Sequence, residues 1–377
     1  MITVKKLLIA TDSFLPRWDG IARFLNEIIP KLAVDYEIKV LAPDFEGEFK
    51  EYIDVDVVRF PLSRMRIADY PVPKPSYKEI RKHVKWADIV WTHTIGPIGA
   101  MTIMAARKEK KKLLAYIHSI EWVLFPRSLR TISIIKWVVH KTSAFISKRL
   151  YNKCDLLLVP SAEVAELLDR KGVRVPKKVV HVGTNTKIFS PPESKAKAKE
   201  AIGIMPNTLV VGFAGRIGLE KDLETLYRAF GRINRKHDAL LLIVGQDLRG
   251  VTKRFQSNPK VRLEGSTNNI VPYMQAMDVY VLSSLTETSS LSTIEAMSCG
   301  AAVISTPVGY VKEYIKEGFN GMFFPKKNAY ELSKKMDKLL KDEFLRKRLG
   351  ENSRRTIIDR FSWDKTVNEL KEVFDKI

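Results

Sequence analysis

The sequence predicts an α/β protein of two doubly wound domains, each with a parallel sheet covered by helices on both faces. Short runs of purely apolar residues alternate with amphipathic runs along the whole chain. Strands that are apolar throughout are typical of parallel sheets, and helical runs between them are typical of crossover connections. The 377 residues exceed one ordinary α/β core. Two domains of roughly 150–200 residues are therefore expected.

The strands and helices follow from these runs in chain order. In the first half, buried strands are predicted at residues 5–11, 37–43, 55–60, 87–93, 112–118 and 154–161. Helical spacing predicts helices at 22–33 and 162–172. The second half repeats the pattern, with strands at 208–216, 239–246, 261–265, 278–284 and 301–309 and helices at 222–234 and 291–300. After Gly321 the chain is predicted to be largely helical.

The boundary between the domains is predicted near the paired prolines Pro191 and Pro192. A run rich in lysine and alanine follows them, which is typical of a linker that leads into a helix. We expect an N-terminal Rossmann-like domain at 1–187 and a C-terminal one at 188–360. Residues 361–377 are expected to form a helix that crosses back to the first domain.

Composition narrows the functional classes. The formal net charge is +21, so we expect an acidic partner: nucleic acid, an anionic membrane surface or a phosphorylated substrate. The two cysteines exclude a disulfide framework and a cysteine metal cage, and they suggest a reducing compartment. No apolar run reaches the roughly 18 residues of a membrane-spanning helix, and the N-terminal apolar run is interpreted as a strand rather than a signal peptide. A cytoplasmic location is expected.

Residues just after the strands are the candidate site residues, because ligands of open parallel sheets bind at the carboxyl ends of strands. Gly20 opens the helix after the first strand, where a glycine lets a phosphate approach the helix N-terminus; an ordinary turn glycine is the alternative. His93 and His118 follow two successive strands and could bond a sugar hydroxyl or carbonyl from one crevice. The alternative is a hydrogen-bonded core histidine. We favour a functional role for His118 and leave both interpretations open for His93.

A cationic pair follows the first strand of the second half. Arg216 and Lys221 lie at a strand-to-helix turn. They could clamp a diphosphate and neutralise the charge that builds on a leaving group. A solvated basic turn is the alternative.

Two glutamates flank a later predicted helix start. Ser289 or Ser290 is a good N-cap for the helix that runs to Met297. Glu287 lies just before this start and Glu295 lies within the helix. A carboxylate can accept two hydrogen bonds from vicinal hydroxyls, so one glutamate for each sugar beside a phosphate-binding helix start is a coherent arrangement. Two surface glutamates on an exposed helix are the alternative.

An ordered set of motifs along nearly all of the chain is similar to a known family. The motifs are PRWDGIAR, WTHTIGP, IHS, GTNTKIFSP, GRIGLEKDLETL, VRLEG, SSLTETSSLSTIEAMSCGAAVISTPVG, EGFNGMFF and FSWDKT. They resemble those of the retaining glycosyltransferases of family 4. The resemblance implies the GT-B fold, in which two Rossmann-like domains enclose the active site in the cleft between them. The first domain would then serve the acceptor and the second the nucleotide-sugar.

The resemblance also implies roles for single residues. His118 would lie at the reacting centre against the donor sugar, Glu287 would contact the transferred sugar, and Glu295 would hold the ribose hydroxyls. Arg216 and Lys221 would bind the diphosphate of a UDP-, GDP- or ADP-sugar. The full donor-binding set would be Gly20, Arg216, Lys221, Glu287, Thr288, Ser289, Ser290, Leu291 and Glu295. No metal or other cofactor would be required.

Two departures from the family pattern concern backbone geometry. Many members have two glycines in the first loop, where Asp19 precedes Gly20 here. Many have Gly-Phe-Gly-Leu where this chain has residues 288–291, so Ser290 replaces a glycine. The loop of Asp19 and Gly20 and the Thr-Glu-Thr run at 286–288 are similar to those of members that act on lipid acceptors. The triplet of Asp54 and Asp56 around Val55 suggests a metal-dependent transferase of another fold, but the surrounding pattern does not fit that fold.

Residues 122–154 are expected to meet the acceptor or a membrane. The segment contains no acidic residue. Basic side chains alternate with aromatic and aliphatic ones, a pattern typical of an amphipathic element on an anionic membrane. A partly buried helix with a solvated basic face is the alternative. The candidate contacts are Trp122, Phe125, Arg127, Arg130, Lys136 and Trp137.

The leading hypothesis is a glycosyltransferase that moves a hexose from a nucleotide-sugar to a lipid or lipid-linked acceptor, peripherally on the inner face of the cell membrane. A second hypothesis is transfer to a soluble acceptor such as a sugar phosphate, a polyol or a polysaccharide. A third is a basic nucleic-acid-binding protein, although no recognition motif supports it. A fourth, a GT-B fold without catalysis, is disfavoured because Arg216, Lys221, Glu287 and Glu295 occur together.

Overall fold

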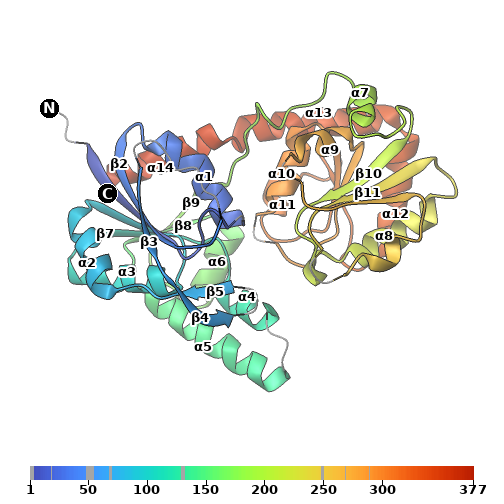
Figure 1. The fold of residues 1–377 in the computed structure, drawn as a ribbon. Coiled ribbons are helices and arrows are strands. Elements are labelled where there is room, and N and C mark those ends of the chain that lie inside the picture. Colours follow the sequence, from blue (N-terminus) through green and yellow to red (C-terminus); the bar gives the residue numbers. More distant parts are fainter. Residues whose placement is uncertain are drawn as a thin grey trace. The chain divides into compact units, whose positions relative to one another are not determined.

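The structure is a computed structural model that describes residues 4–17, 19–47, 55–67, 70–128, 132–247, 250–267, 269–287 and 289–377. The chain forms two compact units (Figure 1). Unit 1 comprises Met1–His181 and Thr366–Ile377, and unit 2 comprises Val182–Lys365. The first unit thus ends a little before residue 187, and the last residues of the chain pack with it.

Unit 1 is built on a seven-stranded parallel sheet in the order β3-β2-β1-β6-β7-β8-β9. Its strands are β1 (Lys5–Ala10), β2 (Tyr36–Pro43), β3 (Val55–Phe60), β6 (Ile89–Thr92), β7 (Lys112–Tyr116), β8 (Leu156–Val159) and β9 (Lys177–Val179). All six strands predicted in this half are present. A separate antiparallel hairpin, β4 (Leu62–Ile67) and β5 (Tyr70–Pro73), was not predicted because its sequence is polar and proline-rich.

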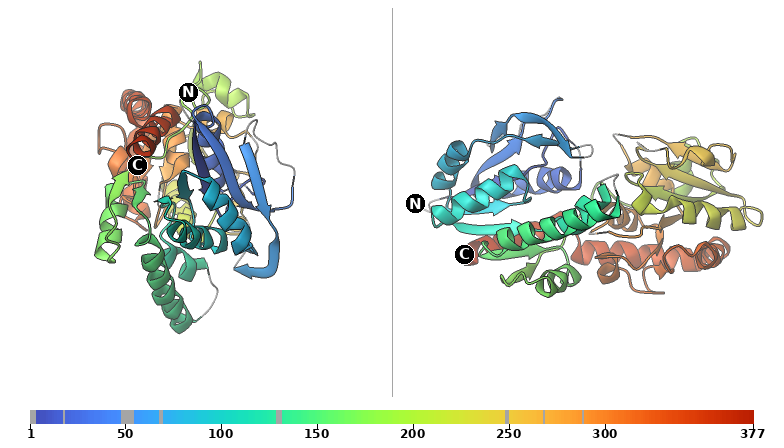
Figure 2. Two further views of the ribbon diagram at one scale, coloured as in Figure 1. Left: turned by 90° about the vertical axis from the view of Figure 1, so that its left-hand side faces the viewer. Right: turned by 90° about the horizontal axis from the view of Figure 1, so that it is seen from below.

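Helices cover both faces of this sheet (Figures 1 and 2). They are α1 (Gly20–Leu32), α2 (Tyr77–Trp86), α3 (Pro97–Lys108), α4 (Glu121–Ser128), α5 (Ser133–Tyr151), α6 (Ala162–Arg170) and α14 (Trp363–Lys376). Side chains alternate between faces along each strand. Trp91 therefore meets Phe24 of α1 and Phe374 of α14, whereas its neighbour Val90 belongs to the core with Ile80 of α2 and Ile103 of α3.

The register of three neighbouring strands places their carboxyl ends together. Ala10 of β1 pairs with Thr92 of β6, and Thr92 pairs with Ala115 of β7. The loops that follow these strands therefore start at one edge of the sheet. They carry His93 and His118.

Unit 2 is built on a six-stranded parallel sheet in the order β12-β11-β10-β13-β14-β15. Its strands are β10 (Leu209–Ala214), β11 (Ala239–Val244), β12 (Val261–Glu264), β13 (Val279–Leu282), β14 (Ala302–Ser305) and β15 (Met322–Phe323). Its helices are α7 (Lys195–Glu200), η1 (Leu219–Lys221), α8 (Leu223–Ile233), η2 (Lys253–Phe255), α9 (Val271–Ala276), α10 (Leu291–Ser298), α11 (Val311–Tyr314), α12 (Ala329–Lys341) and α13 (Glu343–Arg360). The five strands predicted in this half are all present.

Two glycines let the loops after β10 and β11 touch. Gly215 and Gly245 have φ values of 139° and 147°, which side chains rarely adopt. A Cβ on Gly245 would lie 1.9 Å from the Gly215 carbonyl oxygen. The glycines therefore bring these two loops into contact at the carboxyl edge of the sheet, directly before Arg216.

Among the described helices, none combines the length and apolar character needed to cross a bilayer.

Candidate functional site

Lys221 and Glu287 form an ion pair at the carboxyl edge of the unit 2 sheet. Lys221 ends η1, after β10, and Glu287 lies in the loop after β13, the next strand of the sheet. The Lys221 Nζ lies 2.5 Å from Glu287 Oε1, and their side chains are only 16% and 10% exposed. Because β10 and β13 are neighbours, the loops after them bring together Lys221 and Glu287, two residues that the sequence analysis predicted as site residues. A diphosphate entering here would compete with Glu287 for the lysine.

Serine side chains fix this pair in place. The Ser284 hydroxyl donates to the same Glu287 oxygen at 2.6 Å, and the Ser283 hydroxyl donates to the Lys221 carbonyl at 2.8 Å. The Leu285 amide donates to the Glu220 carbonyl at 2.7 Å. These bonds tie the loop after β13 to η1. Sequence reasoning missed Ser283 and Ser284, although two buried serines at the end of an apolar strand could have indicated such a tie.

Arg216 is not part of this buried pair. Its guanidinium lies 2.5 Å from Glu220, four residues later, and its side chain is 69% exposed. An exposed ion pair of this kind contributes little stability, so Arg216 can leave Glu220 for a bound anion at little cost.

The start of α10 follows Glu287. Ser290 stands at the N-cap position with φ 49° and ψ 69°, the left-handed conformation that glycine adopts easily. Its hydroxyl bonds the Thr293 hydroxyl at 2.8 Å instead of capping a backbone amide. Ser290 therefore keeps the glycine-like backbone in place of the family glycine, and its side chain is turned away from the helix amides. Thr288 lies outside the described residues.

Glu295 is buried within α10, with only 1% of its surface exposed. Ser289 and Leu291, at the start of this helix, were also expected to meet the donor. Both are partly buried. The Tyr314 hydroxyl of α11 donates to the Ser289 carbonyl at 3.4 Å and so ties α11 to the loop before α10. The helix is therefore not an exposed surface helix, and that alternative for Glu295 is excluded.

The helix start in unit 1 is built differently. The Asp19 carboxylate accepts the amides of Ile21 and Ala22 at 2.9 and 3.0 Å and also accepts the Ser13 hydroxyl. A Cβ on Gly20 would meet nothing within 4 Å. The conformation at Gly20 thus does not itself require glycine, and a carboxylate already occupies the helix amides that were expected to receive a phosphate.

His118 and His93 contact each other in unit 1. Nδ1 of His93 lies 2.9 Å from Nε2 of His118. Burial lowers the pKa of His118 to about 3 and holds the pKa of His93 well below its usual value, with the neighbouring ring adding to the effect on His93. Both rings are therefore neutral near pH 7. His118 remains partly exposed, whereas His93 is buried.

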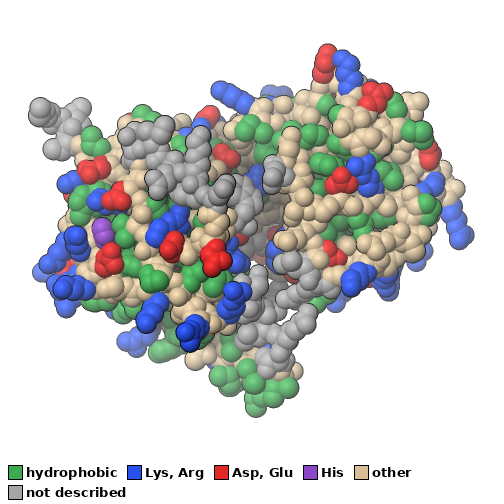
Figure 3. All heavy atoms as spheres, in the orientation of Figure 1, with side chains coloured by type: hydrophobic (Ala, Val, Ile, Leu, Met, Phe, Trp, Pro, Cys, Tyr) green, Lys and Arg blue, Asp and Glu red, His purple; other side chains and the backbone are tan. Residues whose placement is uncertain are grey.

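Helices α4 and α5, which we call the arm of unit 1, contain most of the segment that was expected to meet a membrane. Six large apolar side chains of α5 are exposed: Ile134, Ile135, Trp137, Val138, Phe145 and Ile146. We call these, together with the exposed Lys141, Lys148 and Arg149, the α5 surface. The buried residues of the helix are the small Ser143 and Ser147 and, near its end, Leu150 and Tyr151. Figure 3 shows hydrophobic side chains gathered at the outer end of this arm.

The other residues predicted to contact the acceptor or a membrane differ in how far they are exposed. Trp122 is a correction: it is 2% exposed and belongs to the core, because α4 turns it inward, where its carbonyl bonds His140. Phe125 and Lys136 are partly buried. Arg130 lies outside the described residues, and the side chain of Arg127 is not described.

The acidic triplet provides no described metal site. Asp56 lies in β3 and pairs with Lys39 at 2.9 Å, and Asp54 lies outside the described residues. Within the described ranges, no group of three or more His, Cys, Asp and Glu side chains could hold a metal ion.

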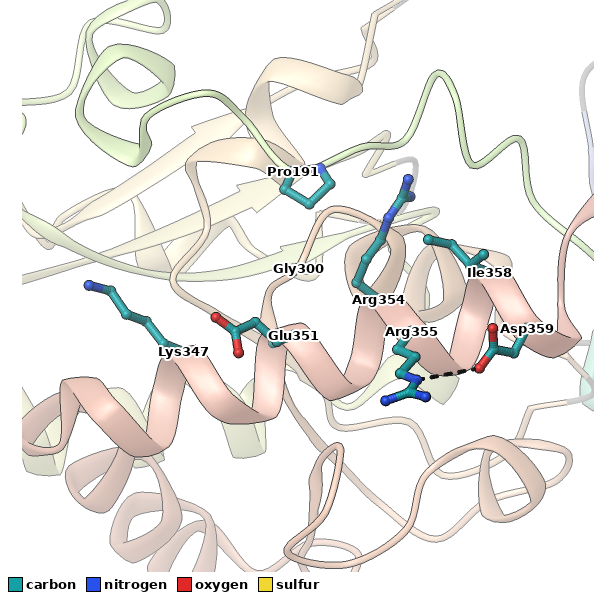
Figure 4. A pocket seen from close by; sticks show the side chains of 9 residues that line it. Pro191, Gly300, Lys347, Glu351, Arg354, Arg355, Ile358 and Asp359 are labelled. Atoms are coloured by element: carbon teal, nitrogen blue, oxygen red, sulfur yellow. Dashed lines mark ion pairs between the residues drawn. The ribbon is translucent and has the colours of Figure 1, made fainter.

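A groove of about 480 Å³ lies along α13 in unit 2 (Figure 4). Gly300, in its wall, precedes β14, so the groove lies at the amino edge of the sheet, away from Lys221 and Glu287. Arg354, also in the wall, donates to the carbonyls of Phe189 and Thr186. Its guanidinium therefore secures the start of unit 2, and we assign the groove no role in the chemistry.

Comparison with known proteins agrees with this architecture. Residues 18–188 match the family model described as Glycosyltransferase Family 4, and residues 194–356 match the model described as Glycosyl transferases group 1. An uncharacterised glycosyltransferase of Methanocaldococcus jannaschii is 27% identical, over 99% of this chain and 98% of that relative.

Two further proteins are similar to this chain over nearly its whole length. A GDP-mannose-dependent monoacylated α-(1-6)-phosphatidylinositol monomannoside mannosyltransferase of Corynebacterium glutamicum is 25% identical, over 97% of this chain and 96% of the relative. The solved structure of sucrose-phosphate synthase from Thermosynechococcus elongatus has a TM-score of 0.80 at 18% identity, over 98% of this chain and 99% of that one. The two α/β units and these matches together identify the chain as a glycosyltransferase with the GT-B fold.

Proposed function

We propose that this glycosyltransferase moves a hexose from a nucleotide-sugar to a lipid or lipid-linked acceptor at a membrane surface, with retention of anomeric configuration and without a metal. Unit 2 binds the donor: Lys221 and Arg216 take the diphosphate, Glu287 the transferred sugar and Glu295 the ribose. His118 of unit 1 contacts the transferred sugar. The phosphatidylinositol-mannoside acceptor in the name of the Corynebacterium relative supports the lipid assignment.

The observation that carries the proposal is the α5 surface. A helix on a water-facing surface normally buries its large apolar residues and exposes its small polar ones. Here Trp137 is 61% exposed while Ser147 is fully buried. Lys141, Lys148 and Arg149 are exposed on the same helix, where Lys141 lies over the Trp137 ring and Arg149 over the Phe145 ring. Residues 122–154 contain no acid. This combination suits the headgroup layer of an anionic bilayer, where each basic residue near the surface contributes about 1 kcal/mol of attraction.

The test is a transfer assay. The protein is incubated with labelled UDP-, GDP- and ADP-sugars and a total lipid extract, with and without EDTA. We expect label from one donor in the organic phase, unaffected by EDTA, with an α-configured product from an α-configured donor. Nucleotide release that depends on added soluble sugars, without organic label, would instead assign a soluble acceptor. Salt-sensitive DNA binding without any turnover would contradict the enzyme itself.

A matched pair of variants tests the α5 surface. The double variant Ile134→Ser/Trp137→Ser is expected to lose flotation with phosphatidylglycerol vesicles and most transfer to lipid. Phe344→Ser is the control, because Phe344 is equally apolar and 75% exposed but lies on α13 in unit 2. Equal vesicle binding by both variants would contradict the membrane assignment.

A further inference from the structure

The two neutral histidines of unit 1 share one proton between facing nitrogens. His93 follows β6 and His118 follows β7, and the ring planes are inclined by 29° with a centroid separation of 5.2 Å. His93 Nδ1 and His118 Nε2 lie 2.9 Å apart, so one of the two donates to the other. In a neutral imidazole one nitrogen carries hydrogen and the other accepts. The direction of this bond therefore fixes which nitrogen of each ring is protonated.

The surroundings of His93 decide the direction. Its Nε2 is buried and has no hydrogen-bond partner among the described residues, and the same is true of the Nε1–H of Trp91. The indole and imidazole rings lie 4.1 Å apart. A hydrogen on His93 Nε2 would add a second unsatisfied donor to this buried cluster, and unsatisfied buried N–H groups are rare in proteins. A bare Nε2 leaves only a lone pair without a partner, and unsatisfied acceptors are less rare in protein interiors than unsatisfied donors.

We propose that His93 is a positioning residue whose Nδ1–H donates to His118 Nε2, so that His118 carries its own hydrogen on Nδ1. The remaining nitrogen of the partly exposed His118 ring is then a neutral hydrogen-bond donor. This inference rests on the proposed function for the contact between His118 and the transferred sugar. It goes beyond it by assigning the proton and naming the residue that controls it.

A neutral donor suits the reaction better than an imidazolium. Positive charge builds on the sugar ring as the bond to a leaving phosphate breaks. A cation at His118 would oppose this charge, whereas an uncharged N–H can hold a sugar oxygen without opposing it; a neutral, tautomer-fixed histidine is an established solution in another enzyme. The pKa of each ring, lowered by burial, agrees with a neutral pair.

Nuclear magnetic resonance of the full chain with ¹⁵N-labelled histidine tests the proton placement directly. The two ring nitrogens of each histidine differ in chemical shift according to which one carries hydrogen, and His118→Gln assigns the signals. We expect the Nδ1–H form of His118 in the wild type and in His93→Asn, whose amide N–H can replace Nδ1–H. In His93→Phe we expect a shift toward the Nε2–H form. An Nε2–H form in the wild type overturns the inference.

Kinetics test the consequence. His93→Phe should lower kcat on the order of ten-fold with less than about a two-fold change in donor KM, and His93→Asn should recover most of kcat. His83→Phe, on α2 outside the ring cluster, is the matched control and should keep the wild-type kcat. Equal losses in His93→Phe and His93→Asn would mean that the N–H donated by residue 93 does not control kcat, which overturns the positioning role.

The two proposals can fail separately. Wild-type protein that shows the Nδ1–H form but transfers no sugar to any acceptor contradicts the proposed function and leaves the proton placement standing. Protein that transfers sugar while His118 is in the Nε2–H form contradicts only the present inference.

Discussion

The two units bury their ionisable side chains in different ways. In unit 1, the buried Asp12 accepts hydrogen bonds from the amides of Ile98 and Gly99, and Glu121 accepts the Tyr151 hydroxyl at 2.6 Å. These partners are neutral. Unit 2 also contains pairs in which opposite charges are buried together: Lys221 lies against Glu287, and Lys199 lies 2.8 Å from Asp278. Lys195 in the same unit is different, because it donates to the neutral carbonyls of Gln275 and Met277.

The difference has chemical consequences. Burial against neutral partners raises the pKa of Asp12 and raises the pKa of Glu121 to about 7. The neighbouring histidines are neutral for the same reason, since burial disfavours the charged form of each group. Neutral donors and acceptors suit the hydroxyls of a sugar. A lysine held by a carboxylate suits a diphosphate, which can replace the carboxylate as its partner. We therefore assign the charge of the substrate to unit 2.

The largest expected effect comes from breaking the pair at the site. Lys221→Ala should lower kcat/KM by about 100- to 1000-fold, because a lost electrostatic contact to a developing anion typically costs this much. The measurement is the transfer assay, normalised to folded protein by circular dichroism. Wild-type rates would remove Lys221 from the site.

Lys199→Ala is the matched control within the same unit. It breaks a pair that is buried as deeply, at 5% and 9% exposure, between α7 and the residue before β13. Removing one partner of a buried ion pair costs roughly 3–5 kcal/mol. Stability should therefore fall at least as much as in Lys221→Ala, while turnover per folded molecule stays near wild type. Equal losses of turnover would mean that both pairs matter only for folding.

A second variant separates donor binding from the chemical step. Glu295→Gln keeps the size of the buried side chain and removes its charge, so the fold should persist. Losing a carboxylate that accepts two ribose hydroxyls should raise the Kd for the nucleotide about ten-fold, as for a charged hydrogen bond of 1.5 kcal/mol. Titration calorimetry with the free nucleoside diphosphate measures it. An unchanged Kd would contradict the ribose role.

The strands were predicted correctly from the sequence because local pattern sets them. The apolar runs of β1, β6, β7, β10 and β13 fixed both sheets, and the strand-end rule selected the loops that carry His118, Lys221 and Glu287. Contacts between loops could not be predicted, because a single side chain decides them. Lys221 meets Glu287 and His93 bonds His118 only because neighbouring strands end in register.

The sequence also did not predict which side chains of a helix are buried and which are exposed. Trp122 and Trp137 are each followed by two aliphatic residues, yet α4 buries the first and α5 exposes the second. Ser290 shows the same limit at the backbone: the sequence put its geometry in doubt, whereas the surrounding loop holds it in the conformation of a glycine. Tertiary packing decides such positions, so local propensity does not reveal them.

The pH dependence of stability provides a third test, which concerns the ionisable groups of unit 1 that are buried against neutral partners. The folded pKa of Glu121 is about 7, above its unfolded value. As pH rises from about 4.5 to 7, the unfolded chain loses this proton first, so Glu121 lowers stability increasingly and by at most about 3 kcal/mol. Glu121→Gln removes this dependence and can still accept from Tyr151. Urea unfolding should therefore show that the variant gains on the wild type between pH 5 and pH 8. Parallel curves would place a counter-charge near Glu121.

The smallest expected effect contrasts the two helix starts. Asp19 caps α1 through two backbone amides, so Asp19→Ala should lower the free energy of unfolding by about 1 kcal/mol. Ser290 does not cap α10 with its side chain, and Ser290→Gly relieves a left-handed backbone while losing one hydroxyl contact to Thr293. These changes oppose each other, so its stability should stay within about 0.5 kcal/mol of wild type, with donor Kd unchanged. A loss in Ser290→Gly as large as in Asp19→Ala would show that the Ser290 hydroxyl, rather than its backbone conformation, organises the start of α10.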